Sequence, residues 1–450
     1  MKPSCFYITG ILLVFAIACQ AQKLERKGSL GVEISPSKDG KGVLIENLMP
    51  EGTAAQIGLK QGDIITRADD KDIEDVPSLV AITSSWKGGQ NCKIDIIRNG
   101  GQRLTLKGKV VGKPMESSSF GTVKYGQISF RDGALRSILH LPNDVQNPPV
   151  IYYIQGFGCN SIDTYAFPKD PLRQLTDEFV KAGFAVFRVE KPGVGDSETK
   201  EDCHQIGYWE EIHAFKTALT QLKKNTLVNP DQVFVFGHSL GGITAPLVAS
   251  EEQVAGIIAY GSVSTSWFEY LIRVLREQAI MTGSDYLTVQ KDVQKRIPLL
   301  YDYLINKQTP EQLEKKEGYN EMMSTGLPMR RGDLMAGRHY SFMQEIQEVD
   351  LAEAYFKSNV PVLALHGEFD VHAINSDWAI EIANMVNSFE NGYGSYKIVK
   401  GTEHGFSLVP SLDVYNRLRR SGTFDKAYMA EHFNPEVVEL VVSWIEELKG

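Results

Sequence analysis

An apolar run that ends in a glycine-flanked serine constrains this chain more than any other stretch. Residues 233–236 are Val-Phe-Val-Phe, which predicts a buried strand, and they lead into a Gly-x-Ser-x-Gly motif centred on Ser239. The apolar residues 243–249 predict a helix directly after the motif. A serine on a sharp turn between strand and helix exposes its hydroxyl, and the flanking glycines let neighbouring backbone approach closely. We therefore predict that Ser239 is a nucleophile and that the backbone N–H of Leu240 faces a developing oxyanion; an ordinary strand-to-helix turn is the alternative.

From residue 126 onward, strand patterns alternate with helix patterns, which argues for a mostly parallel sheet flanked by helices. An opening hairpin is expected over 126–141. Further buried strands are expected at 150–154, 185–189, 233–236, 257–260, 360–367 and 396–399. From about 262 to 347 the alternation stops, and the pattern becomes mostly helical and strongly amphipathic. The sequence thus predicts an α/β domain over 126–450 with a helical insertion.

Two further motifs follow predicted strands of this domain. The first, His-Gly-Glu-Phe-Asp, ends at Asp370, and the second, Gly-Thr-Glu-His-Gly-Phe, contains His404. Together with the serine motif they resemble the α/β-hydrolase family, in which nucleophile, acid and histidine occur in that chain order. The resemblance implies that His404 is the general base and that Asp370 orients its ring and stabilises its charged form. Glu368 and Asp377 are alternative carboxylates on the same segment.

The same resemblance assigns roles outside this triad. Residues 155–158, Gln-Gly-Phe-Gly, stand where many family members have His-Gly, which implies that the N–H of Phe157 is the second oxyanion donor, with Gly158 as the alternative. The loop Lys-Pro-Gly-Val-Gly-Asp-Ser at 191–197 resembles the equivalent loop of dienelactone-hydrolase-like esterases. The segment at 262–347 lies where the family inserts a cap, and its aromatic residues predict a site that favours an apolar acyl or alcohol group.

Residues 28–112 form a separate unit in which short strand patterns alternate with turn signals. Ser-Leu-Gly-Val at 29–32 and Gly-Leu-Lys-Gln-Gly-Asp-Ile-Ile at 58–65 resemble PDZ domains, the first being like that family's carboxylate-binding loop. The resemblance implies a small, mostly-β domain whose backbone N–H groups hold a peptide C-terminus. The implied peptide-binding residues are Leu30, Gly31 and Val32. A groove that docks on the neighbouring domain or serves as a spacer is the alternative, and residues 113–125 are expected to be a linker.

Residues 1–21 have the pattern of an export signal peptide. Lys2 is a weak positive end, and the apolar run 8–18 is too short to span a bilayer comfortably. Cleavage after Ala21 is the favoured route, while Ala-Ile-Ala-Cys, ending at Cys19, offers processing to a lipoprotein; a retained membrane anchor is a further alternative. No later stretch is apolar enough for a transmembrane helix. We therefore expect an exported protein, periplasmic or secreted.

Composition narrows the function classes. The net charge is −9 with no basic run, which disfavours nucleic-acid binding. No H-x-x-E-H, H-E-x-x-H or C-x-x-C motif occurs, so no metal is expected, and hydrolysis needs no cofactor. Cys159 and Cys203 each follow a predicted strand at what should be one sheet edge, which favours a disulfide in an oxidising compartment over free thiols. Cys92 is expected to be a small buried residue.

The leading hypothesis is an exported serine hydrolase, and more narrowly a carboxylesterase that acts on a small-molecule or acyl ester through an acyl-enzyme intermediate. A serine peptidase or amidase that uses the PDZ domain to engage peptide termini is one alternative. A non-catalytic peptide-binding protein is another. Some arginines of the 262–347 segment could meet a carboxylate substrate, although exposed arginines are the commoner case: Arg330, Arg331 and Arg338.

Overall fold

The computed structural model describes residues 24–37, 40–389 and 393–448. The expected signal peptide, its cleavage site after Ala21 and the alternative lipidation site Cys19 lie outside the described residues. Within the described ranges, no helix has the length and apolar character needed to cross a bilayer.

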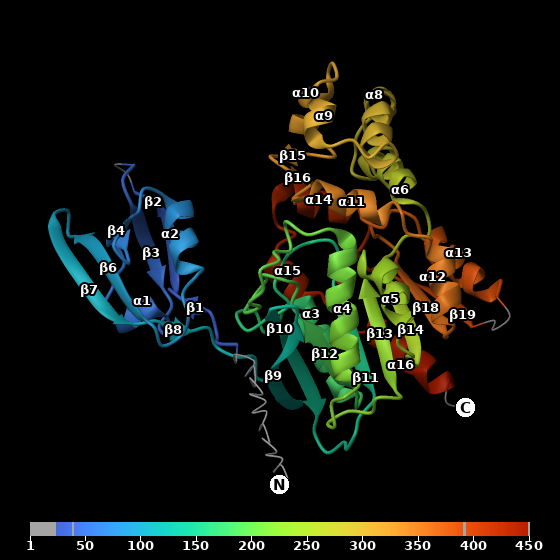
Figure 1. The fold of residues 1–450 in the computed structure, drawn as a ribbon, viewed down its shortest axis with the longest axis horizontal. Coiled ribbons are helices and arrows are strands. Elements are labelled where there is room, and N and C mark those ends of the chain that lie inside the picture. The colour runs from blue at the N-terminus through green and yellow to red at the C-terminus, as the bar shows by residue number, and fades with distance from the viewer. Residues whose placement is uncertain (1–23, 38–39, 390–392, 449–450) are drawn as a thin grey trace, which may run out of the picture.

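The N-terminal part of the chain, drawn in blue in Figure 1, is a six-stranded antiparallel sheet with two short helices. The sheet runs in the order β2-β3-β4-β6-β7, with β5 paired to β4, while β1 pairs with β8 where the chain enters and leaves. This agrees with the mostly-β domain predicted. The elements are β1 (Gly28–Ser29), β2 (Val32–Pro36), β3 (Val43–Leu48), α1 (Thr53–Gln56), β4 (Ile64–Ala68), β5 (Lys71–Asp72), α2 (Val76–Thr83), β6 (Asn91–Arg98), β7 (Gln102–Lys109) and β8 (Val111–Gly112).

This small sheet has a core of its own. Val43 and Ile45, at alternate positions of β3, are buried in the core of the small domain, and Trp86 and Ile94 belong to the same cluster. Helix α2 begins where it does because Asp75 forms a capping box with Ser78, which satisfies backbone donors at the helix start. The separate core lets this unit fold around its own apolar residues.

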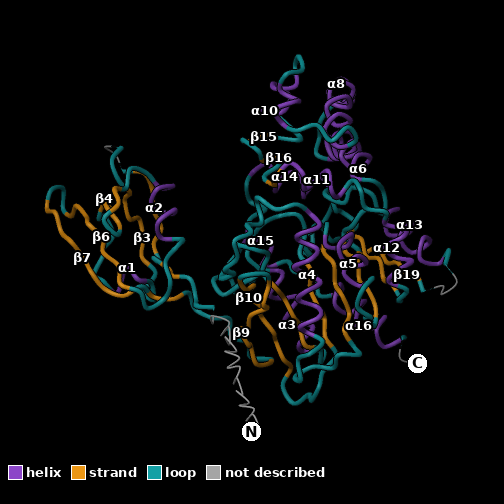
Figure 2. Tube along the Cα trace, viewed as in Figure 1, coloured by secondary structure: helices purple, strands orange, loops and turns teal. Residues whose placement is uncertain are grey.

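The larger domain is built on an eight-stranded sheet in the order β19-β18-β14-β13-β11-β12-β10-β9 (Figure 1), whose strands are drawn in orange in Figure 2. In this sheet the strands from β12 through β11, β13, β14 and β18 to β19 pair in parallel. The opening hairpin β9–β10 is antiparallel, and β10 also pairs antiparallel with β12. This confirms the predicted fold class. The strands are β9 (Gly121–Phe130), β10 (Gly133–Pro142), β11 (Val150–Ile154), β12 (Ala185–Val189), β13 (Val233–His238), β14 (Gly256–Tyr260), β18 (Val362–Gly367) and β19 (Gly394–Val399).

The linker predicted over residues 113–125 extends too far toward the C-terminus. Strand β9 begins at Gly121, so residues 121–125 belong to the sheet. The strand was missed there because β9 is the edge strand, and most of its side chains alternate between exposed and half-buried positions without an apolar run.

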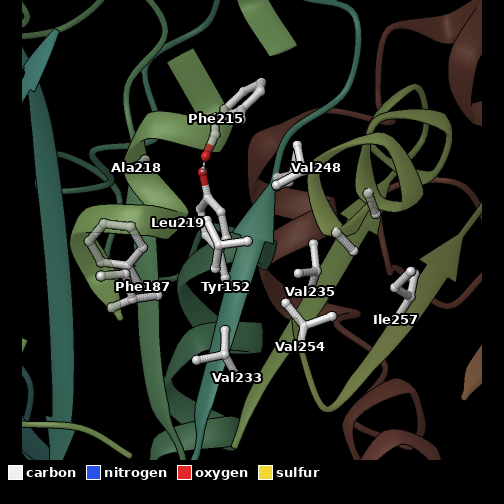
Figure 3. Close-up of a cluster of buried hydrophobic side chains, with 14 of the residues drawn as sticks. Tyr152, Phe187, Phe215, Ala218, Leu219, Val233, Val235, Val248, Val254 and Ile257 are labelled. Carbon is white, nitrogen blue, oxygen red and sulfur yellow. Dashed lines mark hydrogen bonds between the residues drawn. The ribbon is translucent and has the colours of Figure 1, made fainter. Parts of the chain in front are cut away.

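Helices cover both faces of the sheet. Helices α4, α5, α12 and α13 pack on one face around Tyr152 and Phe187, and Figure 3 shows part of this core, in which the Tyr152 hydroxyl donates to the carbonyl of Phe215 at 3.1 Å. Helices α3 and α16 pack on the other face. The helices of the domain outside the insertion are α3 (Pro171–Lys181), α4 (Tyr208–Leu222), α5 (Gly241–Ala249), α12 (Leu351–Ser358), α13 (Asp377–Asn387), α14 (Leu412–Ser421), α15 (Lys426–Glu431) and α16 (Glu436–Glu447).

An insertion between β14 and β18 lies beyond the carboxyl ends of the strands, at the top of Figure 1. It is mostly helical, but it also holds a small three-stranded antiparallel sheet that the pattern did not predict, because its two-residue strands are too short to show alternation. Its elements are α6 (Trp267–Arg273), a π-helical turn (Val274–Gln278), α7 (Ala279–Met281), α8 (Tyr286–Leu304), α9 (Pro310–Glu314), α10 (Tyr319–Thr325), β15 (Arg330–Arg331), β16 (Leu334–Met335), β17 (Arg338–His339) and α11 (Tyr340–Ile346).

The predicted disulfide is confirmed. Cys159 is bonded to Cys203, and Cys92 is a free, buried cysteine as expected. The disulfide ties the segment after β11 to the segment before α4. A crosslink across a sequence separation of 44 restricts the unfolded chain and so favours the folded one.

Residues just before β1 attach the small domain to the large one. Arg26 forms ion pairs with Asp163 and Asp196 of the large domain, the first at 2.7 Å. Lys87, beyond α2, pairs with Glu198 at 2.7 Å. These contacts lie beside the loops that follow β11 and β12.

Candidate active site

Ser239 occupies a strained turn between β13 and α5. Its φ is 58°, in the left-handed region that side chains rarely adopt, and its N–H donates to the carbonyl of Tyr260 at 2.8 Å. The flanking glycines are required by close packing: a Cβ on Gly237 would lie 2.1 Å from the carbonyl oxygen of Gly241, and a Cβ on Gly241 would lie 2.3 Å from that of Ile154. The motif therefore places a serine hydroxyl at the end of a central strand, where strain is retained for function.

Asp370 follows β18 and His404 follows β19, and these two strands are adjacent in the sheet. The Nδ1–H of His404 donates to Oδ2 of Asp370 at 2.7 Å, and the side chain of Asp370 is fully buried. The other carboxylate oxygen accepts from the backbone N–H groups of His372 and Ala373, each at 2.8 Å. Both oxygens of the acid thus accept hydrogen bonds, which fixes the carboxylate, orients the imidazole and leaves its Nε2 available.

Glu368 and Asp377, the alternatives to Asp370 as the partner of His404, lie in other surroundings. Glu368 accepts from the N–H of Gly401 at 2.9 Å and pairs with Lys400 at the surface. Asp377 lies in the first turn of α13. Of the carboxylates on this segment, the structure brings Asp370 to the histidine.

The electrostatics of the pair suit a base and its anionic partner. Burial alone lowers the pKa of His404, but the carboxylate of Asp370 outweighs burial, and the pKa lies above its ordinary value. Burial works to raise the pKa of Asp370, yet the neighbouring His404 ring and its hydrogen bond hold that pKa well below its usual range. The acid therefore stays ionised while the histidine gains proton affinity.

Two histidines beside His404 have other roles. His238 accepts from the Tyr153 hydroxyl through Nδ1 at 3.1 Å and donates through Nε2 to the backbone carbonyl of His404 at 2.9 Å. Burial, together with the nearby His404, lowers the pKa of His238 to about 3, so its ring is neutral. Sequence reasoning did not detect that this side chain holds the His404 loop. His372 lines the cavity, and its pKa is lowered to about 4 by burial.

Ser239 and His404 line the same cavity. The described residues include no hydrogen bond between the serine hydroxyl and the imidazole ring. Catalytic hydrogen bonds are often long or misaligned in ligand-free enzymes and tighten when substrate binds. The arrangement can deliver a serine nucleophile, a base and an oriented acid to one space.

Both predicted oxyanion donors border this space. Phe157 and Leu240 line the cavity with Ser239, and in the described chain neither of their N–H groups donates to another protein group. Gly156, which sequence reasoning did not single out, packs directly on the nucleophile: a Cβ there would lie 2.8 Å from the Cβ of Ser239. The alternative donor residue, Gly158, lies against the side chain of Asn160.

The cavity has a volume of about 630 Å³. Its apolar wall comes largely from the insertion, and of the aromatic residues in that segment Trp267 and Tyr270 reach it, whereas Tyr303 is buried in the core and Tyr286 is exposed. The apolar residues of the lining include Ile243, Val263, Trp267, Tyr270, Leu271, Val274, Leu327 and Met343. Its polar end includes Asn416, Arg419 and Arg420, and no aspartate or glutamate lines it within the described chain.

The arginines considered for a substrate carboxylate do not line this cavity. Arg330 pairs with Glu314, and Arg331 is exposed. Arg338 is neither exposed nor available, because it is buried and bonded to Glu211 at 2.6 Å. Sequence reasoning missed this ion pair, since Arg338 and Glu211 are 127 positions apart.

In the small domain, the predicted peptide-binding residues lie at the start of an edge strand. Leu30 is buried, Gly31 has a φ of +71°, and Val32 begins β2, which pairs with β3 and has α2 packed beside it. Gly31 must be glycine, because its Cβ would lie 2.6 Å from the Cα of Gly52. An edge strand beside a helix is a geometry that can accept an extended peptide.

The described residues contain no group of three or more histidine, cysteine, aspartate or glutamate side chains placed to hold a metal ion.

Comparison with known proteins gives two family matches. Residues 171–406, more than half of the 450-residue chain, match the model described as serine aminopeptidase, S33, and residues 28–110 match the PDZ domain. The Serine protease Do-like HtrA of Lactobacillus helveticus is 39% identical over 71 residues, which are 16% of this chain and 17% of that protein. The chain therefore spans less than a fifth of this relative's length.

Several solved structures resemble the larger domain. Est1E from Butyrivibrio proteoclasticus shares 16% identity at a TM-score of 0.40, covering 67% of this chain and 98% of that one. The hyperthermophilic esterase from the archaeon Pyrobaculum calidifontis shares 16% identity at a TM-score of 0.43, covering 75% and 85%. The α/β hydrolase GrgF from Penicillium sp. sh18 shares 18% identity at a TM-score of 0.40, covering 69% and 99%.

Proposed function

This chain belongs to the α/β-hydrolase family described as serine aminopeptidase, S33, and from that premise we propose that it is an exported carboxylesterase with a Ser239–His404–Asp370 triad. One observation carries the proposal: Ser239, in its left-handed turn, and His404, paired with Asp370 at 2.7 Å, line one cavity.

The proposed reaction follows from these positions. Ser239 attacks the ester carbonyl while His404 takes its proton, and Asp370 stabilises the imidazolium that forms. The N–H groups of Phe157 and Leu240 hold the oxyanion of the tetrahedral intermediate. His404 then protonates the departing alcohol, leaving an acyl group on Ser239. A water molecule, deprotonated by His404, attacks this acyl-enzyme and releases the acid.

The cavity lining favours an ester over a peptide with a free N-terminus. An aminopeptidase has to bind an ammonium group, for which a carboxylate is the natural partner, and the lining contains none within the described chain. Its charged side chains at the polar end are arginines, which repel an ammonium. The apolar wall suits an acyl chain or an aromatic alcohol.

Export is part of the proposal. The support is the signal-like pattern of residues 1–21 together with the Cys159–Cys203 disulfide, since such bonds persist mainly in oxidising compartments. The test is N-terminal sequencing of the exported protein. A start at Gln22 supports cleavage after Ala21, whereas an N-terminal block with a lipid mass on Cys19 supports the lipoprotein route.

A peptidase is the second candidate, favoured by the family description and by the PDZ match. In that case the PDZ domain would engage the termini of the peptide substrate. The ratio of kcat/KM for p-nitrophenyl butyrate to that for an aminoacyl p-nitroanilide separates the two. We expect the ester to be preferred by at least about a hundredfold.

Labelling with a fluorophosphonate probe tests the nucleophile. Wild type is expected to label, Ser239→Ala to lose labelling, and Ser262→Ala, which removes another hydroxyl from the cavity lining, to keep it. Absence of labelling in folded wild type would instead support a non-catalytic, peptide-binding protein.

A further inference from the structure

A buried ionic cluster lies behind the oxyanion loop, residues 155–158. Glu211 of α4 accepts from Lys191 through one carboxylate oxygen at 2.8 Å and from Arg338 through the other at 2.6 Å. Lys191 follows β12, and Arg338 lies in β17 of the insertion. All three side chains are at most 2% exposed. Three distant segments thus bury two cations and one anion together.

Lys191 and Arg338 each make a further hydrogen bond besides the one to Glu211. The ammonium group of Lys191 also donates to the carbonyl of Gly156 at 2.6 Å, and the guanidinium of Arg338 donates to the carbonyl of Phe157 at 2.7 Å. These are consecutive carbonyls of the oxyanion loop. Arg338 also stacks on the ring of Phe342, 3.5 Å from its centroid, which fixes the plane of the guanidinium.

Because the peptide unit is planar, the direction of the Gly156 carbonyl also fixes the direction of the Phe157 N–H. In a trans peptide the N–H points opposite to the preceding C=O, and the bond between Gly156 and Phe157 is trans. With the Gly156 carbonyl directed at Lys191, the Phe157 N–H is directed to the opposite side. Ser239 lies close to this peptide unit: a Cβ built on Gly156 would lie 2.8 Å from the Cβ of Ser239, and Phe157 and Ser239 line the same cavity.

Burying this charge is expensive, which argues that the cluster does more than fill space. Burial lowers the pKa of Lys191 to about 8, even though Glu211 works to raise it. Well-packed apolar side chains of the same volume would often be as stable as such a cluster. Unlike apolar side chains, the buried cations of this cluster supply strong hydrogen-bond donors of fixed direction.

We infer that the Lys191–Glu211–Arg338 cluster holds the oxyanion loop so that the N–H of Phe157 faces the oxygen of the carbonyl group that Ser239 attacks. Lys191 and Arg338 are therefore positioning residues, and Glu211 holds both of them. This inference rests on the proposed function. It also gives the insertion a part in the chemistry, because Arg338 reaches the loop from β17.

The test compares Lys191→Met, which removes the donor but keeps the length, with Arg338→Lys, which keeps the charge but cannot reach Glu211 and Phe157 together. The matched control is Arg173→Met, which breaks a buried pair with Glu116; in the described chain neither residue makes a hydrogen bond or ion pair to residues 155–158. Each variant is measured for kcat and KM on p-nitrophenyl butyrate, for thermal unfolding, and for binding of an alkyl trifluoromethyl ketone, which forms a tetrahedral adduct on the serine.

We expect Lys191→Met and Arg338→Lys to lower kcat by about tenfold to a hundredfold while KM changes by less than about threefold, since a displacement near 1 Å in a catalytic group can cost that much. Ketone affinity should fall by the same factor, because the ketone adduct carries the oxyanion. Arg173→Met should lower the melting temperature and leave kcat unchanged.

A folded Lys191→Met or Arg338→Lys variant with wild-type kcat and ketone affinity overturns the inference. Should Lys191→Met not fold, the Arg338→Lys variant decides alone. Failure of the proposed function is a different result, in which folded wild type neither labels with fluorophosphonate nor forms the ketone adduct.

Discussion

The hydrolase cavity and the PDZ loop are both marked by short motifs, but the chain builds them differently. Ser239 and His404, which line the cavity, follow β13 and β19, Asp370 follows β18, and the proposed oxyanion loop follows β11. The PDZ loop, residues 29–32, is continuous in sequence and is supported mainly by the backbone around Gly52. A local site needs little more than its own residues, whereas an assembled site depends on sheet register and buried polar contacts.

The sharpest test of this difference is Asp370→Asn. An amide in place of the carboxylate cannot stabilise the imidazolium and favours the wrong tautomer, so kcat on p-nitrophenyl butyrate should fall by about a thousandfold or more. Glu368→Gln is the control, because Glu368 is bonded to Gly401 and Lys400, and its kcat should stay within about twofold of wild type. Equal losses in both variants would contradict the assignment of the acid.

Gly156→Ala is expected to have the next largest effect. Its methyl group would have to occupy space 2.8 Å from the Cβ of Ser239, so nucleophile and oxyanion loop must move apart, and kcat should fall about tenfold to a hundredfold. In Gly158→Ala the methyl group meets the flexible end of the Asn160 side chain, which can move, so the loss should be small. The same kinetic assay applies, and a larger loss in Gly158→Ala would favour Gly158 as the oxyanion donor.

The pH profile of kcat/KM tests whether His404 is the general base of the assembled site. His404 must be neutral to accept a proton, and its pKa is raised above the ordinary value by Asp370, so activity should fall by about tenfold per pH unit below a midpoint higher than that of a free imidazole. Asp370 stays ionised through this range, since its pKa is strongly lowered. His372→Gln serves as the control and should leave the midpoint in place, because the pKa of His372 lies at about 4. A midpoint below that of free imidazole in wild type would count against His404 as the base.

The disulfide should affect stability more than turnover. Replacing Cys159 and Cys203 together by serine is expected to lower the free energy of unfolding by about 2–4 kcal/mol, because the unfolded chain regains the freedom of that loop. Calorimetry should show a lower melting temperature that no longer responds to reducing agent. Cys92→Ala, which removes a free buried thiol, should still respond to it. A reductant-insensitive wild type would show that the disulfide adds no stability.

The smallest effect on turnover is expected from the PDZ loop. Gly31→Ala forces a side chain into the left-handed region and against the Cα of Gly52, so the small domain should lose stability, while hydrolysis of p-nitrophenyl butyrate stays within about twofold of wild type. Gly58→Ala has a similar φ but open space around it, and it should destabilise less. A fall in turnover of more than about fivefold in Gly31→Ala would break the comparison and show that the two regions are coupled, for which the ion pairs of Arg26 offer a route.

Sequence reasoning recovered most of the strands of the α/β sheet, because buried parallel strands are continuous apolar runs that need no partner to be recognised. It did not recover the start of β9, whose side chains alternate between exposed and half-buried positions, or the two-residue strands of the insertion. It also could not tell which aromatic residues of the insertion face the cavity, since Trp267 and Tyr303 occur in the same amphipathic pattern.

The family, the alternation of strands and helices, and the motifs around Ser239, Asp370 and His404 can be recognised from the amino-acid sequence, because each depends on residues close together in the chain. The folded chain was needed to show that Asp370 rather than Glu368 meets His404, that His238 bonds to the His404 loop, and that Lys191 and Arg338 donate to carbonyls of residues 155–158. Such contacts join residues far apart in sequence, and whether a charged side chain is solvated or paired depends on which segments the folded sheet brings behind it.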